Sequence, residues 1–375
     1  MSANQPGRAR LRRVGWILLK VLWGLGAAAL VVATLMPFIH TDQWWVRTFD
    51  FPRLQFAVLL VVVLLGYVAM RIFGRFRRWE YVLPAMVLLA LLWQMYAIFP
   101  YTLLMPRQVA DSKTAKEESR LSLIISNVLY DSREVGQLLE LIRRIEPDMV
   151  LLTEPTAWWR EQLETLEETF PHTVLQDQEN EYGMLLYSRL ELINPEVRFL
   201  AQPEVPSIRT GVRLRSGEEV LFYGVHPRPP GLKPAGERER SDSDTRDAEL
   251  LLIAREIKPL GGQPVIVAGD FNDVAWSRST HLFQRVGGLL DPRVGRGLFN
   301  SFDADHPFLR YPLDHVFVSD HFRLTKLQRL PHIGSDHFPI LAILDFDPGA
   351  AAAQDEPQSD AEDKETAGEA IEEGT

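Results

Sequence analysis

The sequence predicts an α/β domain preceded by three membrane-spanning helices. Three long apolar stretches lie within the first 105 of the 375 residues. From residue 121 onward the pattern changes to short β-branched and aliphatic runs. Four of these runs end in a polar side chain, as buried strands that lead into functional loops do. A helix is expected between the first two strands, over residues 133–145.

Residues 1–105 form the expected membrane region. The stretches at about 17–38, 54–72 and 81–104 are apolar, and each is close to the roughly 20 residues that a helix needs to cross a bilayer. A cleaved signal peptide would explain only the first stretch, which lacks a small-residue cleavage site. Buried helices of a large soluble core are disfavoured, because three such stretches would have to crowd into one hundred residues.

Basic residues flank these stretches unevenly. Four arginines precede the first stretch and four more, at positions 71, 75, 77 and 78, lie at the end of the second stretch or between it and the third, whereas the loop 39–53 carries two arginines and two aspartates. Lysine and arginine favour the cytoplasmic side of a membrane. We therefore expect a multi-pass protein of the cell membrane, with a cytoplasmic N-terminus and an extracytoplasmic chain after residue 104.

The other segments flank one sizeable domain, expected over residues 121–347. Residues 106–120 are polar and predict a linker, and the acidic residues 348–375 predict a disordered tail, because they contain too little apolar surface to fold. Residues 81–347 carry a net charge of −10, so the domain lacks the broad basic surface typical of nucleic-acid binding. The chain has no cysteine, which excludes disulfides, thiol catalysis and cysteine-ligated zinc.

Polar residues at the ends of the expected strands form the candidate site. Rigid strands position such residues well, and strand ends gathered at one sheet edge often carry function. The residues are Asn127 after the run 123–125, Glu154 after 149–152, His226 after 220–223, and Asp270 and Asn272 after 265–268. Two later clusters, Asp314 before an apolar run and Ser335-Asp336-His337, complete the set.

These residue types suit metal-assisted cleavage of a phosphoester. A hard divalent cation such as Mg²⁺ prefers carboxylate and amide oxygens, which Asn127, Glu154 and Asp336 can supply. The attacking water needs a hydrogen-bond acceptor that orients and deprotonates it. Asp270 suits that task.

A histidine held by a carboxylate suits the phosphate side of the reaction. Such a histidine can donate a hydrogen bond to a phosphate oxygen and remain charged as negative charge develops. Asp314 and His337 are the expected pair, and His226 is a second candidate donor. His315 is expected to pack beside Asp314.

Each residue taken alone also fits a structural role. An Asp after a strand is more often a turn or helix-cap residue than a catalyst. Glu154 could simply end its strand, because the residue before a proline is pushed out of the helical region. The ordered co-occurrence of several motifs is what favours a site.

Three runs carry a resemblance to a known family: VIVAGDFN (265–272), LDHVFVS (313–319) and GSDH (334–337). Together they resemble the endonuclease/exonuclease/phosphatase superfamily, in the family's order from about residue 121 to 346, as in a membrane-anchored, bacterial-type member. The resemblance implies a two-sheet α/β sandwich of the metal-dependent phosphoesterase type and an Mg²⁺ (or Mn²⁺) cofactor. It assigns Asn127, Glu154 and Asp336 to the metal; His226, Asp270, Asn272, Asp314 and His337 to catalysis; and Asn272 and His226 also to the substrate.

Two positions depart from the family pattern. Leu129 stands where some members have an additional acid, and Pro227 follows His226 where many members have leucine. The loop 227–244 is rich in proline, glycine and charge and is expected to form a rim of the site. Its basic residues and one just beyond it either bind phosphate or are solvated surface groups, and Arg228 is assigned to substrate binding. They are Arg228, Lys233, Arg238, Arg240 and Arg246.

The expected protein is a membrane-tethered, divalent-metal-dependent hydrolase that cleaves a phosphodiester or phosphomonoester with activated water. Nucleic acid, a phospholipid head group and a small phosphorylated molecule all remain open as substrates. An endonuclease or exonuclease acting on extracytoplasmic nucleic acid is therefore one alternative. A non-catalytic membrane binding module is another, although such a module needs no water-orienting Asp beside an Asp–His pair.

Overall fold

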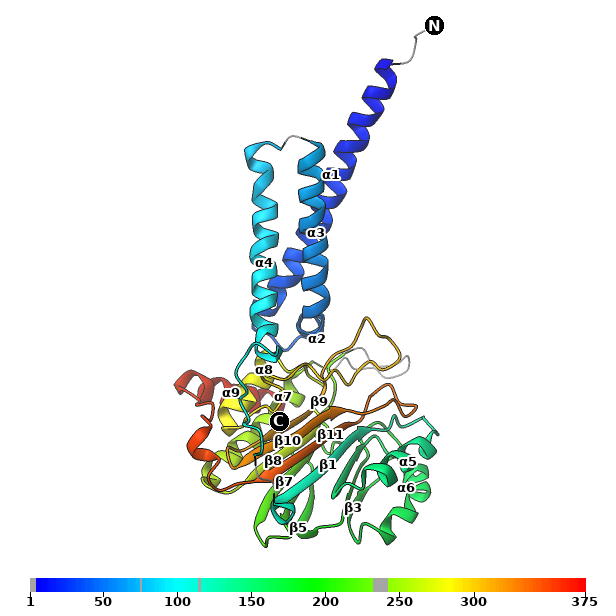
Figure 1. The fold of residues 1–375 in the computed structure, drawn as a ribbon, viewed down its shortest axis with the longest axis vertical. Helices are drawn as coiled ribbons and strands as arrows, with labels where there is room; N and C mark the ends of the chain where they lie inside the picture. Colours follow the sequence, from blue (N-terminus) through cyan, green and yellow to red (C-terminus); the bar gives the residue numbers. More distant parts are fainter. Residues whose placement is uncertain (1–4, 75, 114–115, 232–241) are drawn as a thin grey trace. The chain divides into compact units, whose positions relative to one another are not determined.

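The computed structural model describes residues 5–74, 76–113, 116–231 and 242–375 (Figure 1). The chain forms two compact units. One consists of residues 1–41 and 45–99, and the other of residues 42–44 and 100–375.

The first unit is helical. Its long helices are α1 (Gln5–Leu35), α3 (Arg53–Phe73) and α4 (Val82–Ile98), which pack around a small apolar core that includes Ala27, Leu60 and Val87. Segments Arg13–Phe38, Arg53–Phe73 and Arg78–Tyr101 are long and apolar enough to cross a membrane. At most 22% of the most apolar part of each segment is buried, so most of its apolar side chains face outward, as lipid-facing helices require.

The second unit contains two mixed β-sheets. In the described residues the first sheet has the strand order β10-β11-β1-β2-β4-β3 and the second the order β5-β6-β7-β8-β9. The strands of the first sheet are β1 (Arg120–Asn127), β2 (Met149–Thr153), β3 (His172–Gln176), β4 (Met184–Ser188), β10 (Phe322–Arg329) and β11 (Ile340–Phe346). Those of the second are β5 (Glu191–Arg198), β6 (Ser207–Arg213), β7 (Glu219–Val225), β8 (Val265–Asp270) and β9 (Asp314–Val318).

Helices cover the outer faces of the two sheets. They are α5 (Val135–Ile145), α6 (Ala157–Gln162), α7 (Asp244–Ile257), α8 (Arg278–Gly287) and α9 (Ala361–Gly374). A separate short helix, α2, spans Trp44–Arg47. Single turns of 3₁₀ helix occur at Met36–Phe38, Thr48–Asp50, Arg78–Tyr81, Phe99–Tyr101, Glu117–Ser119, Glu164–Glu168, Lys258–Leu260 and Ala351–Ala353. The expected helix at 133–145 is α5.

Alternate residues of the central strands point into different layers. Ile125 and Leu151 of the first sheet meet Phe222 and Ile266 of the second in the core between the sheets. The alternate residues of β1 and β2, such as Ile124, face outward and pack under α5 and α6. Burial on both faces explains why these strands read as continuous apolar runs rather than as alternating patterns. The predicted two-sheet α/β sandwich is confirmed.

Parallel pairing brings the strand ends to one edge. β1 and β2 are parallel, with Asn127 opposite Thr153, and β7 and β8 are parallel, with Val225 opposite Gly269. Gly269 has φ +146° and approaches Val225 so closely that an added Cβ would lie 1.9 Å from the carbonyl oxygen of Val225. Only glycine accommodates that geometry directly before Asp270.

Two flanking segments differ from the sequence expectation. Val109, within the expected linker, is fully buried in the core between the sheets, and the backbone of Ala110, which follows it, hydrogen-bonds to Leu324 and to the Gln354 side chain. The expected disordered tail contains α9, which is capped by the Asp360 side chain and buries Ala367 near the α7 and α8 core. A stripe of small residues on an acidic helix is a weak sequence signal, which is why composition favoured disorder.

Candidate active site

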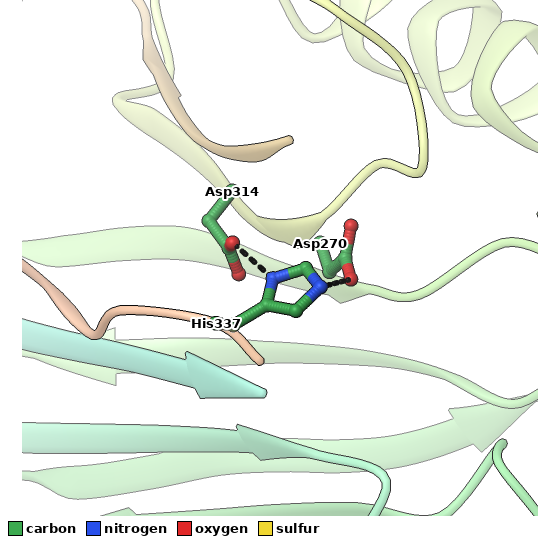
Figure 2. Close-up of side chains that lie close together, drawn as sticks. All are labelled: Asp270, Asp314 and His337. Carbon is green, nitrogen blue, oxygen red and sulfur yellow. Dashed lines mark hydrogen bonds and ion pairs between the residues drawn. The ribbon is translucent and has the colours of Figure 1, made fainter. Parts of the chain in front are cut away.

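Asp314 and His337 form a buried pair beside Asp270, the last residue of β8 (Figure 2). The His337 Nδ1–H donates to Asp314 Oδ2 at 2.7 Å, and His337 Nε2 faces Asp270 Oδ2 at 3.6 Å. Burial alone would lower the pKa of His337, but the neighbouring carboxylates, Asp314 above all, outweigh it and raise this pKa to about 10. The imidazole is therefore charged at neutral pH, as a donor to phosphate needs to be.

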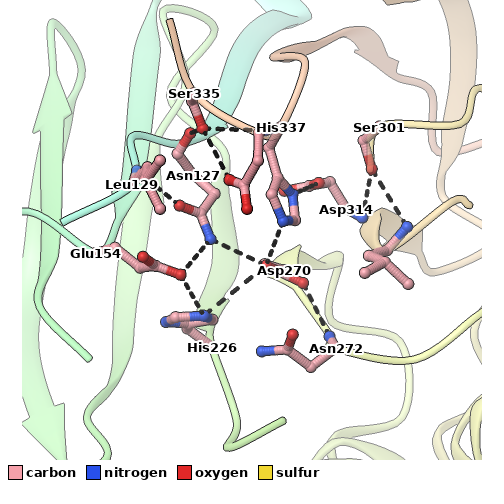
Figure 3. A network of polar contacts seen from close by, with 12 residues as sticks. Asn127, Leu129, Glu154, His226, Asp270, Asn272, Ser301, Asp314, Ser335 and His337 are labelled. Carbon is pink, nitrogen blue, oxygen red and sulfur yellow. Dashed lines mark hydrogen bonds and ion pairs between the residues drawn. The ribbon is translucent and has the colours of Figure 1, made fainter. Parts of the chain in front are cut away.

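Glu154 follows β2 and makes three hydrogen bonds, of which Figure 3 shows the one with Asn127. Its Oε1 accepts the Asn127 side-chain N–H at 2.7 Å, its Oε2 accepts the Tyr130 N–H at 3.3 Å, and its own N–H donates to the Gly183 carbonyl at 2.8 Å. Burial raises the pKa of Glu154 to about 7, although the hydrogen bond from Asn127 acts in the opposite direction. A nearby cation would stabilise the ionised form of such a buried carboxylate.

The Asn127 amide joins the two sheets. Its oxygen accepts the Leu129 N–H at 2.9 Å, while its NH₂ group donates to Glu154 and, at 3.2 Å, to Asp270 Oδ2. The hydroxyl of Ser335 donates to the Asn127 carbonyl at 2.8 Å, which fixes the Ser-Asp-His segment against β1. In this arrangement Asn127 orients two carboxylates, and its assignment as a metal ligand stays a prediction.

Asp270 lies between the two histidines. Its Oδ1 accepts the Asn272 N–H at 2.9 Å, and its Oδ2 lies 3.8 Å from His226 Nε2. Asn272 adopts φ +50° and donates its side-chain N–H to the Pro227 carbonyl at 3.0 Å. Burial lowers the pKa of His226, so this imidazole is neutral at neutral pH, and among the described residues its Nδ1 has no hydrogen-bond partner. The two histidines therefore differ in charge.

The carboxylates fit a hard divalent cation. Glu154, Asp270 and Asp336 repel one another electrostatically, and burial raises the pKa of Asp336 as it does that of Glu154. A second grouping, Asp270, Asp314 and His337, has possible ligand atoms within 4.8 Å of one another. In that grouping His337 Nδ1 is already occupied by its hydrogen bond to Asp314. Glu154 and the half-buried Asp336 therefore remain the residues that we expect to hold a metal.

The structure brings most of the predicted site residues together. Seven of them share the connected set of contacts in Figure 3: Asn127, Glu154, His226, Asp270, Asn272, Asp314 and His337. Asp336 acts on this group through its charge. The assignment of Arg228 to substrate stays a prediction, and Lys233, Arg238 and Arg240 lie outside the described residues.

Arg246 does not belong to a solvated or phosphate-binding rim. It lies in α7, is completely buried, and pairs with Asp247 and Asp273 while its Nη1 donates to the Asn272 carbonyl at 3.0 Å. The helix turns it inward, which a count of basic residues cannot reveal. Arg246 therefore supports the loop that carries Asn272.

Sequence reasoning missed two further contributors. The Ser301 hydroxyl accepts the Asp314 N–H at 3.0 Å, and the Phe302 ring lies 4.9 Å from the His337 ring, centroid to centroid. Neither residue belongs to a recognisable motif, because both lie in an irregular loop. His315, expected beside Asp314, instead donates from Nε2 to the Asp273 carbonyl at 2.8 Å.

The endonuclease/exonuclease/phosphatase family model matches residues 125–337. No curated protein sequence matches the chain. Similar solved structures include the human Nocturnin catalytic domain with bound sulfate (16% identity, 64% of this chain and 97% of that one, TM-score 0.47). Another is D. rerio TDP2 complexed with a single-strand DNA product (18% identity, 60% of this chain and 99% of that one, TM-score 0.45). A third is an endonuclease/exonuclease/phosphatase from Bacteroides vulgatus (17% identity, 61% of this chain and 99% of that one, TM-score 0.48).

The matched region covers more than half of the chain. It begins in β1 just before Asn127 and ends at His337, so it contains all the residues of the connected site. The chain belongs to the endonuclease/exonuclease/phosphatase family.

Proposed function

We propose that the protein is a divalent-metal-dependent phosphoesterase that hydrolyses its substrate by direct attack of water. The observation that carries this proposal is the position of Asp270, which lies 3.6 Å from the charged His337 and 3.8 Å from the neutral His226 and is oriented by Asn127 and Asn272. Hydrolysis requires a group that accepts a hydrogen bond from the attacking water and, next to it, a group that donates a hydrogen bond to the phosphate.

Each residue of the site has a separate role in the proposed reaction. Asp270 accepts a proton from the attacking water, and His337, kept charged by Asp314, donates to a phosphate oxygen. His226 and Asn272 bind the phosphate group. Glu154, with Asp336 beside it, would hold the divalent cation, which would neutralise phosphate charge and assist the leaving oxygen.

The substrate class is open between a phosphodiester and a phosphomonoester. Nuclease activity on extracytoplasmic nucleic acid is the principal alternative, and the acidic charge of the domain speaks against it. The test is a panel of DNA, RNA, phospholipids and generic phosphomonoesters and phosphodiesters, assayed with the full chain in detergent, with and without Mg²⁺. Hydrolysis of at least one class by the parent and not by Asp270→Asn supports the proposal. Phosphoester binding without turnover would favour the binding module.

We further propose that three membrane spans tether the catalytic unit on the extracytoplasmic side. The outward-facing apolar side chains of the three helices and the excess of arginine before the first and third spans support this topology. A reporter fused after Arg120 is expected to show extracytoplasmic activity, and a fusion in the loop around Gly74 is expected to show cytoplasmic activity. The reverse pattern would contradict the orientation.

A further inference from the structure

The residues at the end of the third apolar segment, Pro100 and Tyr101, pack against the second unit's loops. Tyr101, the last residue of that segment, is only 3% exposed, and its hydroxyl donates to the Ala275 carbonyl at 2.7 Å. Its ring meets Trp276 edge-on at 5.9 Å between centroids, and the carbonyl of Pro100 accepts the Gly295 N–H at 2.9 Å. Tyr101 thus makes specific contacts although it lies outside the family-matched region.

Ala275 belongs to the loop 271–277, which directly follows Asp270. Three buried groups hold the backbone carbonyls of this loop. Arg246 donates to the Asn272 carbonyl at 3.0 Å and His315 to the Asp273 carbonyl at 2.8 Å. Tyr101 supplies the third contact. The first of these carbonyls belongs to a proposed phosphate-binding residue, so the loop's position bears directly on the chemistry.

Tyr101 also reaches the loop through Arg293. The Arg293 guanidinium lies 6.0 Å from the centroid of the Tyr101 ring and is paired with Asp291 at 2.8 Å. It also hydrogen-bonds to His315 Nδ1, so the Nε2–H of His315 is free to donate to Asp273. Burial lowers the pKa of His315 well below its ordinary value, which keeps this ring neutral, and the hydrogen bond that Arg293 donates to Nδ1 leaves the ring proton on Nε2. The tyrosine therefore supports the loop by two connected routes.

The segment between the first two apolar helices contacts the chain just before α7, the helix that carries Arg246. The Asp42 carbonyl accepts the Ser243 N–H at 2.8 Å, and the Trp44 N–H donates to the Asp242 side chain at 3.0 Å. Ser243 directly precedes the first turn of α7, which contains Arg246. Residues 42–44 thus contact the start of the helix whose Arg246 holds Asn272, and Tyr101 holds Ala275 directly.

We propose that Tyr101 is a positioning residue of the active site, which holds the loop 271–277 so that Asp270 and Asn272 keep their catalytic geometry. This inference rests on the proposed hydrolytic function. It makes turnover dependent on a residue of the second unit that precedes the family-matched region. A catalytic group displaced by about 1 Å can lose about a hundredfold in rate, and loss of one of several contacts should cost less.

The test compares two buried tyrosine hydroxyls in the full-length protein. Tyr101→Phe removes the bond to Ala275, and the matched control Tyr223→Phe removes a buried hydroxyl that bonds to Glu256 at 3.1 Å, within the second sheet and α7. Melting temperature, kcat and KM are measured with bis-p-nitrophenyl phosphate. We expect similar losses of melting temperature, but a roughly tenfold loss of kcat with little change in KM for Tyr101→Phe only. Unchanged kcat in both variants, or equal losses in both, would overturn the proposal.

Hydrogen exchange separates this inference from the proposed function. Tyr101→Phe is expected to speed amide exchange in residues 271–277, whereas Tyr223→Phe is not. If the parent protein hydrolyses no phosphoester, the proposed function fails while faster exchange still shows that Tyr101 holds the loop. Unchanged exchange in 271–277 would refute the positioning role whatever the activity.

Discussion

Replacing either member of the Asp314–His337 pair is expected to reduce kcat by about a hundredfold or more, and the double variant is expected to be little worse than the worse single variant. The two side chains are buried and joined by a 2.7 Å hydrogen bond, so each depends on the other. Loss of one preorganised donor at a developing charge typically costs about 3 kcal/mol, and residues that act as a unit give non-additive losses. The measurement is kcat and melting temperature of Asp314→Asn, His337→Ala and the double variant on the same preparations.

The chain offers a matched control for this pair. His321 Nδ1 and Asp320 Oδ1 also form an Asp–His pair, 3.1 Å apart, but this pair follows the end of β9 that lies opposite Asp314, so His321→Ala should leave kcat unchanged. Additive losses in the double variant would mean that Asp314 and His337 work separately. A lower melting temperature with normal kcat in Asp314→Asn would reduce the pair to a structural role.

The pH profile of turnover is expected to follow the charge of His337. Because the carboxylates, chiefly Asp314, raise the pKa of His337 to about 10, the charged donor persists through neutral pH and is lost only as pH rises through about 10. In Asp314→Asn the carboxylate that contributes most to the raised pKa is gone, so the alkaline fall should move toward neutral pH. An alkaline limb at the same pH in parent and variant would contradict this assignment.

Glu154→Gln is expected to lower turnover by orders of magnitude while making the metal-free protein more stable above pH 7. Burial raises the pKa of Glu154 from its ordinary value of 4.5 to about 7. The native state therefore retains a proton that the unfolded chain loses, and the free energy of unfolding falls as pH rises between these two values. The cost above pH 7 is about 3 kcal/mol, and a neutral glutamine avoids it.

Thermal unfolding with and without Mg²⁺ checks the Glu154 prediction. In chelator at pH 8 the variant should melt above the parent, and near pH 4.5 the two should melt together. Mg²⁺ should raise the melting temperature of the parent, because it binds the native state, but not that of the variant. An equal Mg²⁺ response in parent and variant would exclude Glu154 as a ligand.

The central fold and the grouping of the candidate site residues were largely predictable from the sequence. Strands buried on both faces leave long apolar runs, and parallel pairing necessarily brings the ends of such strands to one edge. Asn127, Glu154, His226 and Asp270 could therefore be placed together before any coordinates. The motif around His337 added the remaining pair because its order along the chain matches a family.

Other features depend on tertiary contacts that no local pattern encodes. Arg246 reads as one of several loop bases, yet the first turn of α7 directs it inward between two carboxylates. Tyr101 lies in the third apolar stretch of the sequence, yet its hydroxyl donates a hydrogen bond to the Ala275 carbonyl. The direction of the Asn127 amide is likewise decided by the Leu129 N–H, a backbone contact that composition cannot reveal.

Metal-dependent turnover by the full chain tests the central claim most directly. The measurement is hydrolysis of bis-p-nitrophenyl phosphate and p-nitrophenyl phosphate by the detergent-solubilised protein in excess chelator, and again after Mg²⁺ or Mn²⁺ is restored. The proposed chemistry predicts no turnover in chelator, recovery with either metal, and no recovery in Glu154→Gln or His337→Ala. Full turnover in excess chelator, or recovery in the Glu154→Gln variant equal to that of the parent, would contradict it.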